Sequence, residues 1–279
     1  MNAARLLSGA LALVPFSVRT RIHQIPGVAP LQRWVVARLG RGDSFAHRIS
    51  AGPAKGLMFG VKLPEDKLYW AGHWEAEVTG ILARAVRPGA VCYDIGGHRG
   101  FMAGVMALHG AAEVHCFEPN PVNAVQIEDL QALNPVLPIL LHRMAIGAED
   151  GRVAFDVMPD TAMGKLASSD FQHGRAGAKR LEVDLRRLDG LIAAGAVPPA
   201  DLIKIDIEGA ELEALQGAAD LVAAQSPVLL IEVHSHALFQ GCAAWLRARG
   251  YGVEVVEMPI ASVKAEAFRV CHILARPKG

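Results

Sequence analysis

The sequence predicts an α/β fold in which a doubly wound, mostly parallel sheet carries helices on both faces. Three observations support this prediction. Short apolar, strand-like runs alternate with helical stretches from residue 75 to residue 275. One of these runs, residues 91–95, leads directly into a glycine-rich turn and a helix. The next run, residues 113–117, ends in an acid, Glu118. Ligands of doubly wound sheets bind across the carboxyl ends of the strands, so both features are expected at one edge.

The first 42 residues form a basic arm with six arginines and no acidic residue, a charge of +6. Because the whole chain has a net charge of 0, the remainder carries −6. The apolar residues of the arm fall on two helical stripes: Leu7, Ala10, Leu11 and Val14, then Leu31, Trp34, Val35 and Leu39. Such an arm either contacts an anionic membrane surface or packs on the domain as a helical cap. No apolar run reaches the roughly 20 residues that a membrane span needs.

A hairpin is expected over residues 47–63, because two strand-like runs flank the turn-rich residues 52–56. An aromatic segment, residues 68–75, precedes a helix over 75–85, and its rings either wall a site or fill the core. We expect residues 1–67 to form the arm and hairpin, and residues 68–279 to form the main α/β domain.

The turn after residues 91–95 is the first candidate site. Gly96, Gly97 and Gly100 lack the Cβ atoms that would keep a ligand from the backbone. Their spacing differs from the dinucleotide fingerprint, and Asp94 would repel a pyrophosphate. Asp94 favours a ligand with positive character, such as S-adenosylmethionine, which has an ammonium, a sulfonium and no phosphate.

Glu118 is the second candidate, because Pro119 ends the strand directly after it. A carboxylate at this position accepts two hydrogen bonds at once, which suits the two hydroxyls of a ribose. An acid at each of these two strand ends is more specific than either acid alone.

The remaining elements are expected in chain order. Helices are expected over 101–109, 122–133, 211–219 and 241–249, with another ending near 194; strands are expected over 139–147, 201–207, 227–236, 251–257 and 268–275, with an edge strand over 152–157. Residues 159–180 are weakly patterned and are expected to form a mobile loop over the site. The four cysteines form no C-x-x-C pair and are interpreted as buried thiols in a reducing compartment.

Acidic and histidine side chains gather at two further strand ends. These are Asp206, Glu208, Glu232, His234 and His236. His234 is the first candidate for a general base, because an imidazole titrates near neutrality, and Asp206 is the second. The same residues could hold a divalent ion, but the sequence contains no dense ligand motif, and our prediction is that no metal is required.

Several segments resemble the FkbM-type S-adenosylmethionine-dependent methyltransferases in order and spacing. These are residues 94–100, 117–121, 145–147, 188–189, 203–211 and 231–234. The family usually has Asn where this chain has His98, followed by Arg99. The resemblance implies a Rossmann-like class I methyltransferase fold: a seven-stranded sheet with one antiparallel strand. It also implies methyl transfer, usually to a hydroxyl oxygen.

By position, the resemblance implies a cofactor site and a catalytic site. Asp94, Gly96, Gly97, His98 and Gly100 would hold the amino-acid end of S-adenosyl-L-methionine. Glu118, Pro119 and Asn120 would lie at the ribose, and Met144 and Ala145 at the adenine; the catalytic candidates are His234, Asp206 and Glu208.

The sequence therefore predicts a cytoplasmic O-methyltransferase acting on a small molecule or a glycan. If the arm of residues 1–42 contacts the inner face of a membrane, a lipid-linked saccharide is an attractive substrate. The alternative is a non-catalytic module of the same fold that binds the cofactor or a partner, which the departure at His98 motivates. Nucleic acid is not expected as a partner, because the remainder of the chain is acidic.

Overall fold

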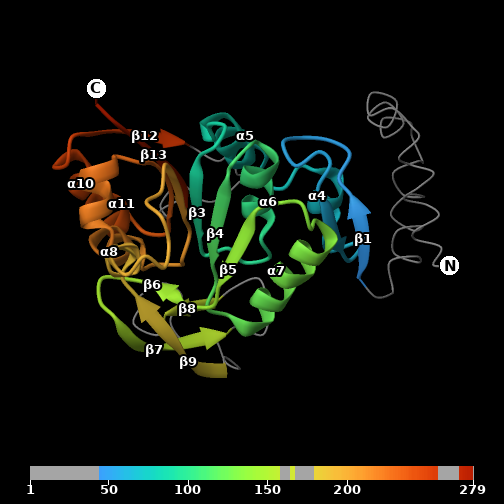
Figure 1. Ribbon diagram of the computed structural model, residues 1–279, viewed down its shortest axis with the longest axis horizontal. Coiled ribbons are helices and arrows are strands. Elements are labelled where there is room, and N and C mark those ends of the chain that lie inside the picture. Colours follow the sequence, from blue (N-terminus) through green and yellow to red (C-terminus); the bar gives the residue numbers. More distant parts are fainter. Residues whose placement is uncertain (1–43, 158–163, 167–178, 257–269, 279) are drawn as a thin grey trace.

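The structure is a computed structural model that describes residues 44–157, 164–166, 179–256 and 270–278 (Figure 1). The predictions for the basic arm, and for most of the loop over residues 159–180, lie outside these described residues. Within the described ranges, no helix is long and apolar enough to cross a bilayer.

A seven-stranded sheet forms the centre of the molecule, in the order β12-β13-β11-β10-β3-β4-β5. Its strands are β3 (Val91–Ile95), β4 (Glu113–Phe117), β5 (Ile139–His142), β10 (Leu202–Ile205), β11 (Val228–Val233), β12 (Tyr251–Val256) and β13 (Cys271–Pro277). Strand β13 pairs antiparallel with β11 and β12, whereas β11, β10, β3, β4 and β5 are parallel neighbours. The predicted Rossmann-like sheet with one antiparallel strand is confirmed.

Helices cover both faces of this sheet (Figure 1). One face carries α5 (Ala76–Ala85), α6 (Phe101–Leu108) and α7 (Pro121–Leu133), with the short α4 (Lys67–Ala71) beyond them; the other carries α8 (Leu188–Ala193), α9 (Glu211–Gln216), α10 (Ala219–Gln225) and α11 (His236–Arg247). Successive residues of a strand point to opposite faces. Cys92 accordingly packs in the core on the α6 face, while Tyr93 and Ile95 pack in the core on the α11 face.

The predicted hairpin is present as β1 (Phe45–Arg48) and β2 (Met58–Val61), which pair antiparallel. Its buried side chains, such as Phe59, belong to the core on the α6 face. Asn134, which comes directly after α7, fixes the hairpin: its Oδ1 accepts from the Met58 N–H at 3.0 Å, and its Nδ2 donates to the Met58 carbonyl at 2.7 Å. The domain boundary at residue 67 stays a prediction, but the hairpin and the sheet share one core.

Two strand predictions are wrong in detail. The single strand expected over residues 139–147 is split, because the Met144 N–H turns back to the His142 carbonyl at 3.0 Å and redirects the chain. Beyond this turn the chain forms a second sheet, in the order β6-β9-β7-β8, made of β6 (Ala145–Ile146), β7 (Gly151–Val157), β8 (Gly164–Leu166) and β9 (Lys179–Arg186). The expected edge strand is β7, and it lies inside this second sheet, between β9 and β8.

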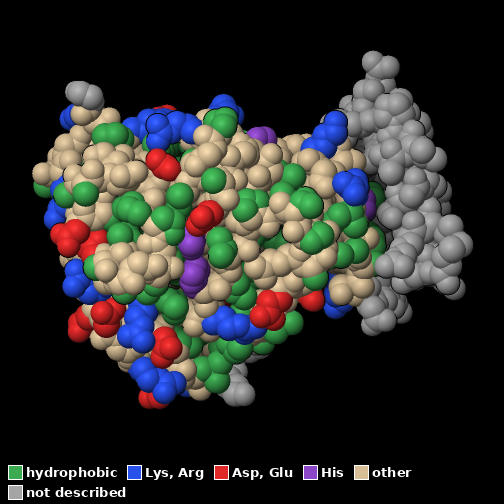
Figure 2. All heavy atoms as spheres, viewed as in Figure 1, with side chains coloured by type: hydrophobic (Ala, Val, Ile, Leu, Met, Phe, Trp, Pro, Cys, Tyr) green, Lys and Arg blue, Asp and Glu red, His purple; other side chains and the backbone are tan. Residues whose placement is uncertain are grey.

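The surface of the second sheet carries charges of both signs. Figure 2 shows acidic and basic side chains intermingled over β7 and β9. Arg180 Nε, for example, lies 2.9 Å from Asp156 Oδ1. The inner side of the second sheet contributes Ile146 and Phe155 to a cavity at the edge of the main sheet.

Candidate functional site

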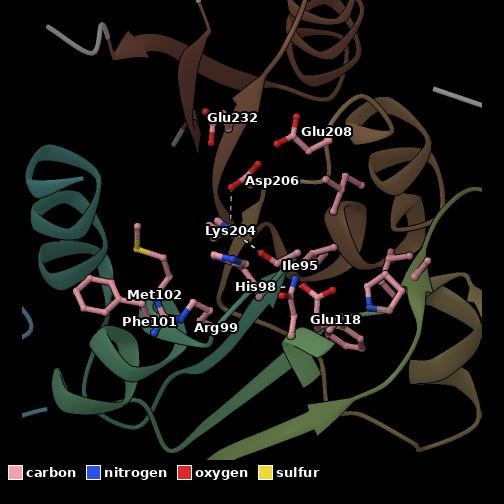
Figure 3. A pocket seen from close by; sticks show the side chains of 18 of the residues that line it. Ile95, His98, Arg99, Phe101, Met102, Glu118, Lys204, Asp206, Glu208 and Glu232 are labelled. Carbon is pink, nitrogen blue, oxygen red and sulfur yellow. Dashed lines mark hydrogen bonds and ion pairs between the residues drawn. The ribbon is translucent and has the colours of Figure 1, made fainter. Parts of the chain in front are cut away.

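A cavity of about 310 Å³ lies at the carboxyl ends of β3, β4 and β10. This volume is at the lower end of the range for ligand pockets. Figure 3 shows His98 after β3, Glu118 after β4, and Lys204 and Asp206 at the end of β10 around this cavity. The cavity is therefore where a doubly wound sheet is expected to bind a ligand.

The glycine turn forms one wall of the cavity. The N–H groups of Gly96 and Gly97 both donate to the Phe117 carbonyl, at 3.0 and 3.1 Å, which holds the turn against the end of β4. His98 has a φ of +49°, in the left-handed region where Asn and His are enriched among non-glycine residues. His98 thus adopts a backbone conformation that Asn also favours. Burial, with Arg99 next, lowers the pKa of His98 to about 4, so its imidazole is neutral.

Glu118 is held in place by two backbone amides. Its Oε2 accepts from the His98 N–H at 2.7 Å, and its Oε1 accepts from the Asn120 N–H at 2.8 Å. The side chain is buried, which raises the pKa of Glu118 to about 7. Each carboxylate oxygen has two acceptor positions. Glu118 therefore keeps acceptor capacity toward the cavity that it lines.

Asp94 and Lys204 are direct neighbours on adjacent parallel strands. Lys204 Nζ lies 3.3 Å from Asp94 Oδ1 and 3.3 Å from Asp206 Oδ2, and donates to the Gly96 carbonyl at 3.0 Å. Asp94 Oδ2 accepts from the Ala103 N–H in the first turn of α6, at 3.0 Å. Asp94 is fully buried behind the cavity, whereas Lys204 lines it.

Burial and the neighbouring charges shift the pKa values of both Asp94 and Lys204. Burial raises the pKa of Asp94, and Lys204 opposes that rise. Burial alone would lower the pKa of Lys204, but the surrounding carboxylates, Asp206 and Asp94 first, raise it above its ordinary value. Lys204 is therefore a permanent cation at the floor of the cavity.

The segment before α5 forms a wall on the opposite side. Tyr69 and Trp74 stack with ring centroids 4.2 Å apart, and both line the cavity. Arg99 ties this segment to the glycine turn, because its Nη1 lies 2.8 Å from Asp66 Oδ1 and its guanidinium lies 5.2 Å from the centre of the Tyr69 ring. The two interpretations left open for the aromatic segment thus both hold, since Tyr69 also belongs to the core.

Glu75 extends the same wall. Its φ of +41° lies in the left-handed region, which is uncommon for a residue other than glycine, and its side chain lines the cavity. Burial, and Asp206 after it, raise the pKa of Glu75 to about 7.

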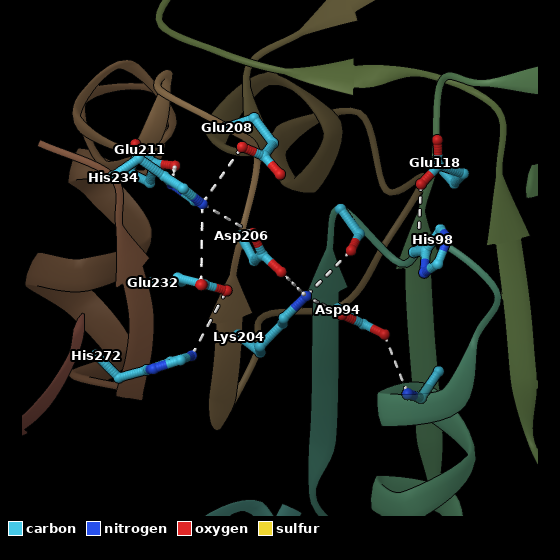
Figure 4. A network of polar contacts seen from close by, with 12 residues as sticks. Asp94, His98, Glu118, Lys204, Asp206, Glu208, Glu211, Glu232, His234 and His272 are labelled. Atoms are coloured by element: carbon cyan, nitrogen blue, oxygen red, sulfur yellow. Dashed lines mark hydrogen bonds and ion pairs between the residues drawn. The ribbon is translucent and has the colours of Figure 1, made fainter. Parts of the chain in front are cut away.

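A cluster of carboxylates surrounds His234 (Figure 4). His234 Nδ1 lies 3.0 Å from Oε1 of Glu211. Its Nε2 faces Glu208 Oε2 at 3.5 Å, Asp206 Oδ1 at 3.7 Å and Glu232 Oε1 at 3.9 Å. Burial alone would lower the pKa of His234, but its hydrogen bond to Glu211 and the nearby acids raise it to about 9. An imidazole with an ordinary pKa can accept a proton near neutral pH. His234 is already protonated at neutral pH, so in this state it cannot accept another proton.

The strands before the cluster are shorter than the sequence predicts. Strand β10 ends at Ile205, and residues 206–209 form a turn in which Glu208 has a φ of +55°. Asp206 and Glu208 therefore lie on a turn and not on one strand face. Likewise β11 ends at Val233, and His236 begins α11 after the cap residue Ser235, whose Oγ accepts from the Leu238 N–H at 3.2 Å.

The structure brings most of the predicted site residues to one cavity. It is lined by Gly96, Gly97, His98, Glu118, Pro119, Met144, Ala145, Asp206 and Glu208. Asp94, Gly100, Asn120 and His234 lie behind this lining: Gly100 and Asn120 are the cap residues of α6 and α7. The roles assigned to these residues from the sequence stay predictions.

Among the residues that line the cavity, Lys204 and Glu75 were not assigned to the site from the sequence, whereas the aromatic segment with Tyr69 and Trp74 was considered as a wall of it. A signal for Lys204 was present, because a lysine inside the apolar run of residues 202–205 needs a buried counter-charge. Glu75 carries no comparable signal, because its position in the site depends on how the N-terminal segment folds back.

Comparison with known proteins places the chain in a family. The model of the methyltransferase FkbM domain matches residues 94–253. The hexuronic acid methyltransferase AglP of Haloferax volcanii is 26% identical over 163 residues, which are 58% of this chain and 63% of that protein. The 2-O-methyltransferase NoeI of Sinorhizobium fredii is 25% identical over 174 residues, 58% of this chain and 70% of that protein. The match thus spans less than two thirds of the first of these relatives.

Two solved structures show similar chain traces. The FkbM methyltransferase from Methylobacillus flagellatus KT has a TM-score of 0.47 at 15% identity, over 88% of this chain and 59% of that one. The precorrin-6y C5,15-methyltransferase from Geobacter metallireducens has a TM-score of 0.46 at 15% identity, over 73% of this chain and 89% of that one. The family match covers more than half of the chain and includes the glycine turn, Glu118 and the Asp206 turn, so the chain belongs to the FkbM methyltransferase family.

Proposed function

We propose that the protein is an S-adenosylmethionine-dependent O-methyltransferase that acts on a hydroxyl of a saccharide. The observation that carries this proposal is Glu118, which two backbone amides aim at a cavity beside the glycine turn. A carboxylate held in this way, with acceptor capacity left, fits the two hydroxyls of a ribose. Membership of the family supports methyl transfer. The name of one relative, a hexuronic acid methyltransferase, supports a sugar acceptor.

Bound S-adenosylmethionine supplies a methyl group that is already activated on a sulfonium. The chain's own residues then have three tasks. Glu118 and the backbone at His98 hold the nucleoside, and Tyr69 and Trp74 exclude water from the cavity. Asp206 receives the proton of the acceptor hydroxyl, because it lines the cavity while His234 lies behind it.

Methyl transfer is tested directly with S-adenosylmethionine that carries a labelled methyl group. We expect label on an oxygen of a uronic-acid-containing oligosaccharide, and an Asp206→Asn variant whose kcat falls at least about 100-fold, the usual contribution of acid–base catalysis. The variant should still bind S-adenosylhomocysteine, because Asp206 is not assigned to the nucleoside. Binding of the cofactor without transfer to any sugar or small hydroxyl acceptor would favour the non-catalytic module instead.

Cofactor affinity should depend on pH through Glu118. The pKa of Glu118 is about 7, and the ionised form is the better acceptor for two hydroxyls. The ionised fraction falls as pH drops through 7, so the affinity for S-adenosylhomocysteine should fall about tenfold between pH 8 and pH 6. Calorimetric titration at the two pH values measures this change. In Glu118→Ala the affinity should be about 100-fold weaker and no longer pH-dependent; a pH dependence of full size in this variant contradicts the assignment.

A further inference from the structure

The polar cluster around His234, whose carboxylates line the cavity, holds one imidazole nitrogen in a fixed direction. Glu211 fixes the His234 ring through Nδ1 at 3.0 Å, and the Gly209 N–H in turn donates to the same Glu211 oxygen at 3.0 Å. Nε2 of His234 therefore has a set direction, toward the oxygens of Asp206, Glu208 and Glu232 (Figure 4). A histidine whose second nitrogen is oriented by a buried carboxylate is the usual form of a metal-binding histidine.

The distances within the cluster fit ligands that surround one ion. Nε2 of His234 lies 3.5–3.9 Å from one oxygen of each of the three carboxylates. Ligand atoms at about 2.1 Å from a common ion lie roughly 3.0–3.5 Å from one another. One ligand atom each from Asp206, Glu232 and His234 all lie within 4.8 Å of one another. A shortening of these separations by at most roughly 1.3–1.8 Å would therefore bring these atoms to the spacing of ligands around one ion.

His272 provides a second, independent observation. Its side chain is only 2% exposed, and neither ring nitrogen has a hydrogen-bond partner within the described ranges of the chain. Its Nε2 faces Oε2 of Glu232 at 3.6 Å, because the two residues are register partners on β13 and β11. A buried imidazole without a hydrogen bond is costly unless a ligand completes it. Its direction points to the same cluster (Figure 4).

A bound cation here would take the place of protons, because His234 holds a proton near neutrality and burial, with Asp206 next, raises the pKa of Glu232 to about 9. Asp206, Glu208 and Glu232 all line the same end of the cavity. Lys204 offers one ammonium, which already lies 3.3 Å from both Asp94 and Asp206. Asp206 divides its oxygens between two neighbours, with Oδ2 toward Lys204 and Oδ1 toward His234. The Oδ1 oxygen is therefore directed into the cluster and away from the lysine.

We propose that Asp206, Glu232 and His234 form a binding site for a divalent cation of the magnesium or manganese class, with Glu208 and His272 at its margin. Two carboxylates and one imidazole are a hard to borderline ligand set, which suits Mn²⁺ and Mg²⁺. Because the carboxylates line the cavity, a bound ion would contact an acceptor hydroxyl and make it more acidic. This catalytic role rests on the proposed function, whereas binding of the ion does not.

The test is a titration of the full chain with Mn²⁺ alone, without cofactor or acceptor, in which electron paramagnetic resonance measures the unbound ion. We expect one Mn²⁺ per chain, displaced by excess Mg²⁺. The variants Glu232→Gln and His234→Asn should each weaken binding at least about tenfold, since removing even an outer partner of a metal ligand costs that much. Glu254→Gln, on an exposed glutamate of β12, is the matched control and should bind as the unchanged chain does.

Absence of Mn²⁺ binding by the unchanged chain overturns the proposal, whatever the variants do. Binding that the control loses as strongly as the cluster variants also overturns it. Titration of the same samples with S-adenosylhomocysteine separates this proposal from the proposed function. Mn²⁺ binding without nucleoside binding supports the cation site and contradicts the proposed cofactor. Nucleoside binding without Mn²⁺ binding supports the cofactor and contradicts the cation site.

Discussion

Lys204→Met is expected to destabilise the fold by about 3–5 kcal/mol, the usual cost of removing one partner from a buried ion pair. Lys204 is buried and lies 3.3 Å from Asp94, which is fully buried itself. Without the ammonium, Asp94 becomes a buried carboxylate whose remaining contact is the Ala103 N–H. Urea unfolding measures the loss. Lys62→Met is the matched control, because this lysine is exposed and its ion pair with Glu65 is long, at 3.9 Å; the variant should change stability by less than about 0.5 kcal/mol.

A double variant identifies the cause of the Lys204 effect. Lys204→Met combined with Asp94→Asn removes both charges and keeps an oxygen for the Ala103 N–H. The double variant should therefore be more stable than Lys204→Met alone. If the two variants are equally unstable, the pair with Asp94 is not what Lys204 contributes, and its contacts with Asp206 and the Gly96 carbonyl, or the packing of its side chain, explain the loss.

Gly96→Ala is expected to cost roughly 2–5 kcal/mol and to abolish nucleoside binding, because it combines backbone strain with a collision. Gly96 has a φ of +79°, and a Cβ atom there would overlap the Asp206 carbonyl oxygen. The left-handed conformation costs an alanine roughly 1–2 kcal/mol, and relief of the collision must move either the glycine turn or the Asp206 turn. Both turns line the cavity, so the cost extends to the site. Thermal unfolding and titration with S-adenosylhomocysteine measure the two effects.

Gly89→Ala separates the collision from the backbone conformation. Gly89 has a φ of +82°, close to that of Gly96, but no atom of the residues that the structure describes lies within 4 Å of the position of its Cβ. We expect this control to lose only the roughly 1–2 kcal/mol of the left-handed conformation and to bind the nucleoside normally. Equal losses of stability and of nucleoside binding in the two variants would show that the close approach of the Asp206 carbonyl to Gly96 does not maintain the site.

The sequence predicted the parts of the site that depend on local patterns. Gly96, Gly97 and Glu118 come directly after strands that end in turns, and the structure places all three in the cavity. The Rossmann-like architecture was also predictable, because alternating strands and helices permit few arrangements. The glycine turn, the acid after β4 and the order of strands and helices were predictable because each depends on residues that are close together in the chain.

The remainder depends on contacts between distant residues. Lys204 meets Asp94 only because β10 pairs with β3 in one particular register. The second sheet forms because the chain turns at Met144, and a strand pattern does not state which sheet a strand joins. Glu75 and Tyr69 reach the cavity through the fold of the N-terminal segment, which Arg99 holds in place through its ion pair. The carboxylates around His234 likewise come from separate segments, because Asp206 and Glu208 follow β10 whereas Glu232 lies in β11.

We propose that S-adenosylmethionine binds in the cavity between the glycine turn and Glu118. A crystal structure of the chain with S-adenosylhomocysteine would show where the nucleoside lies. We predict that the ribose hydroxyls donate to the Glu118 carboxylate and that the sulfur lies on the side of Asp206. A nucleoside bound away from Glu118, or a cavity that stays empty at saturating ligand, would contradict this claim.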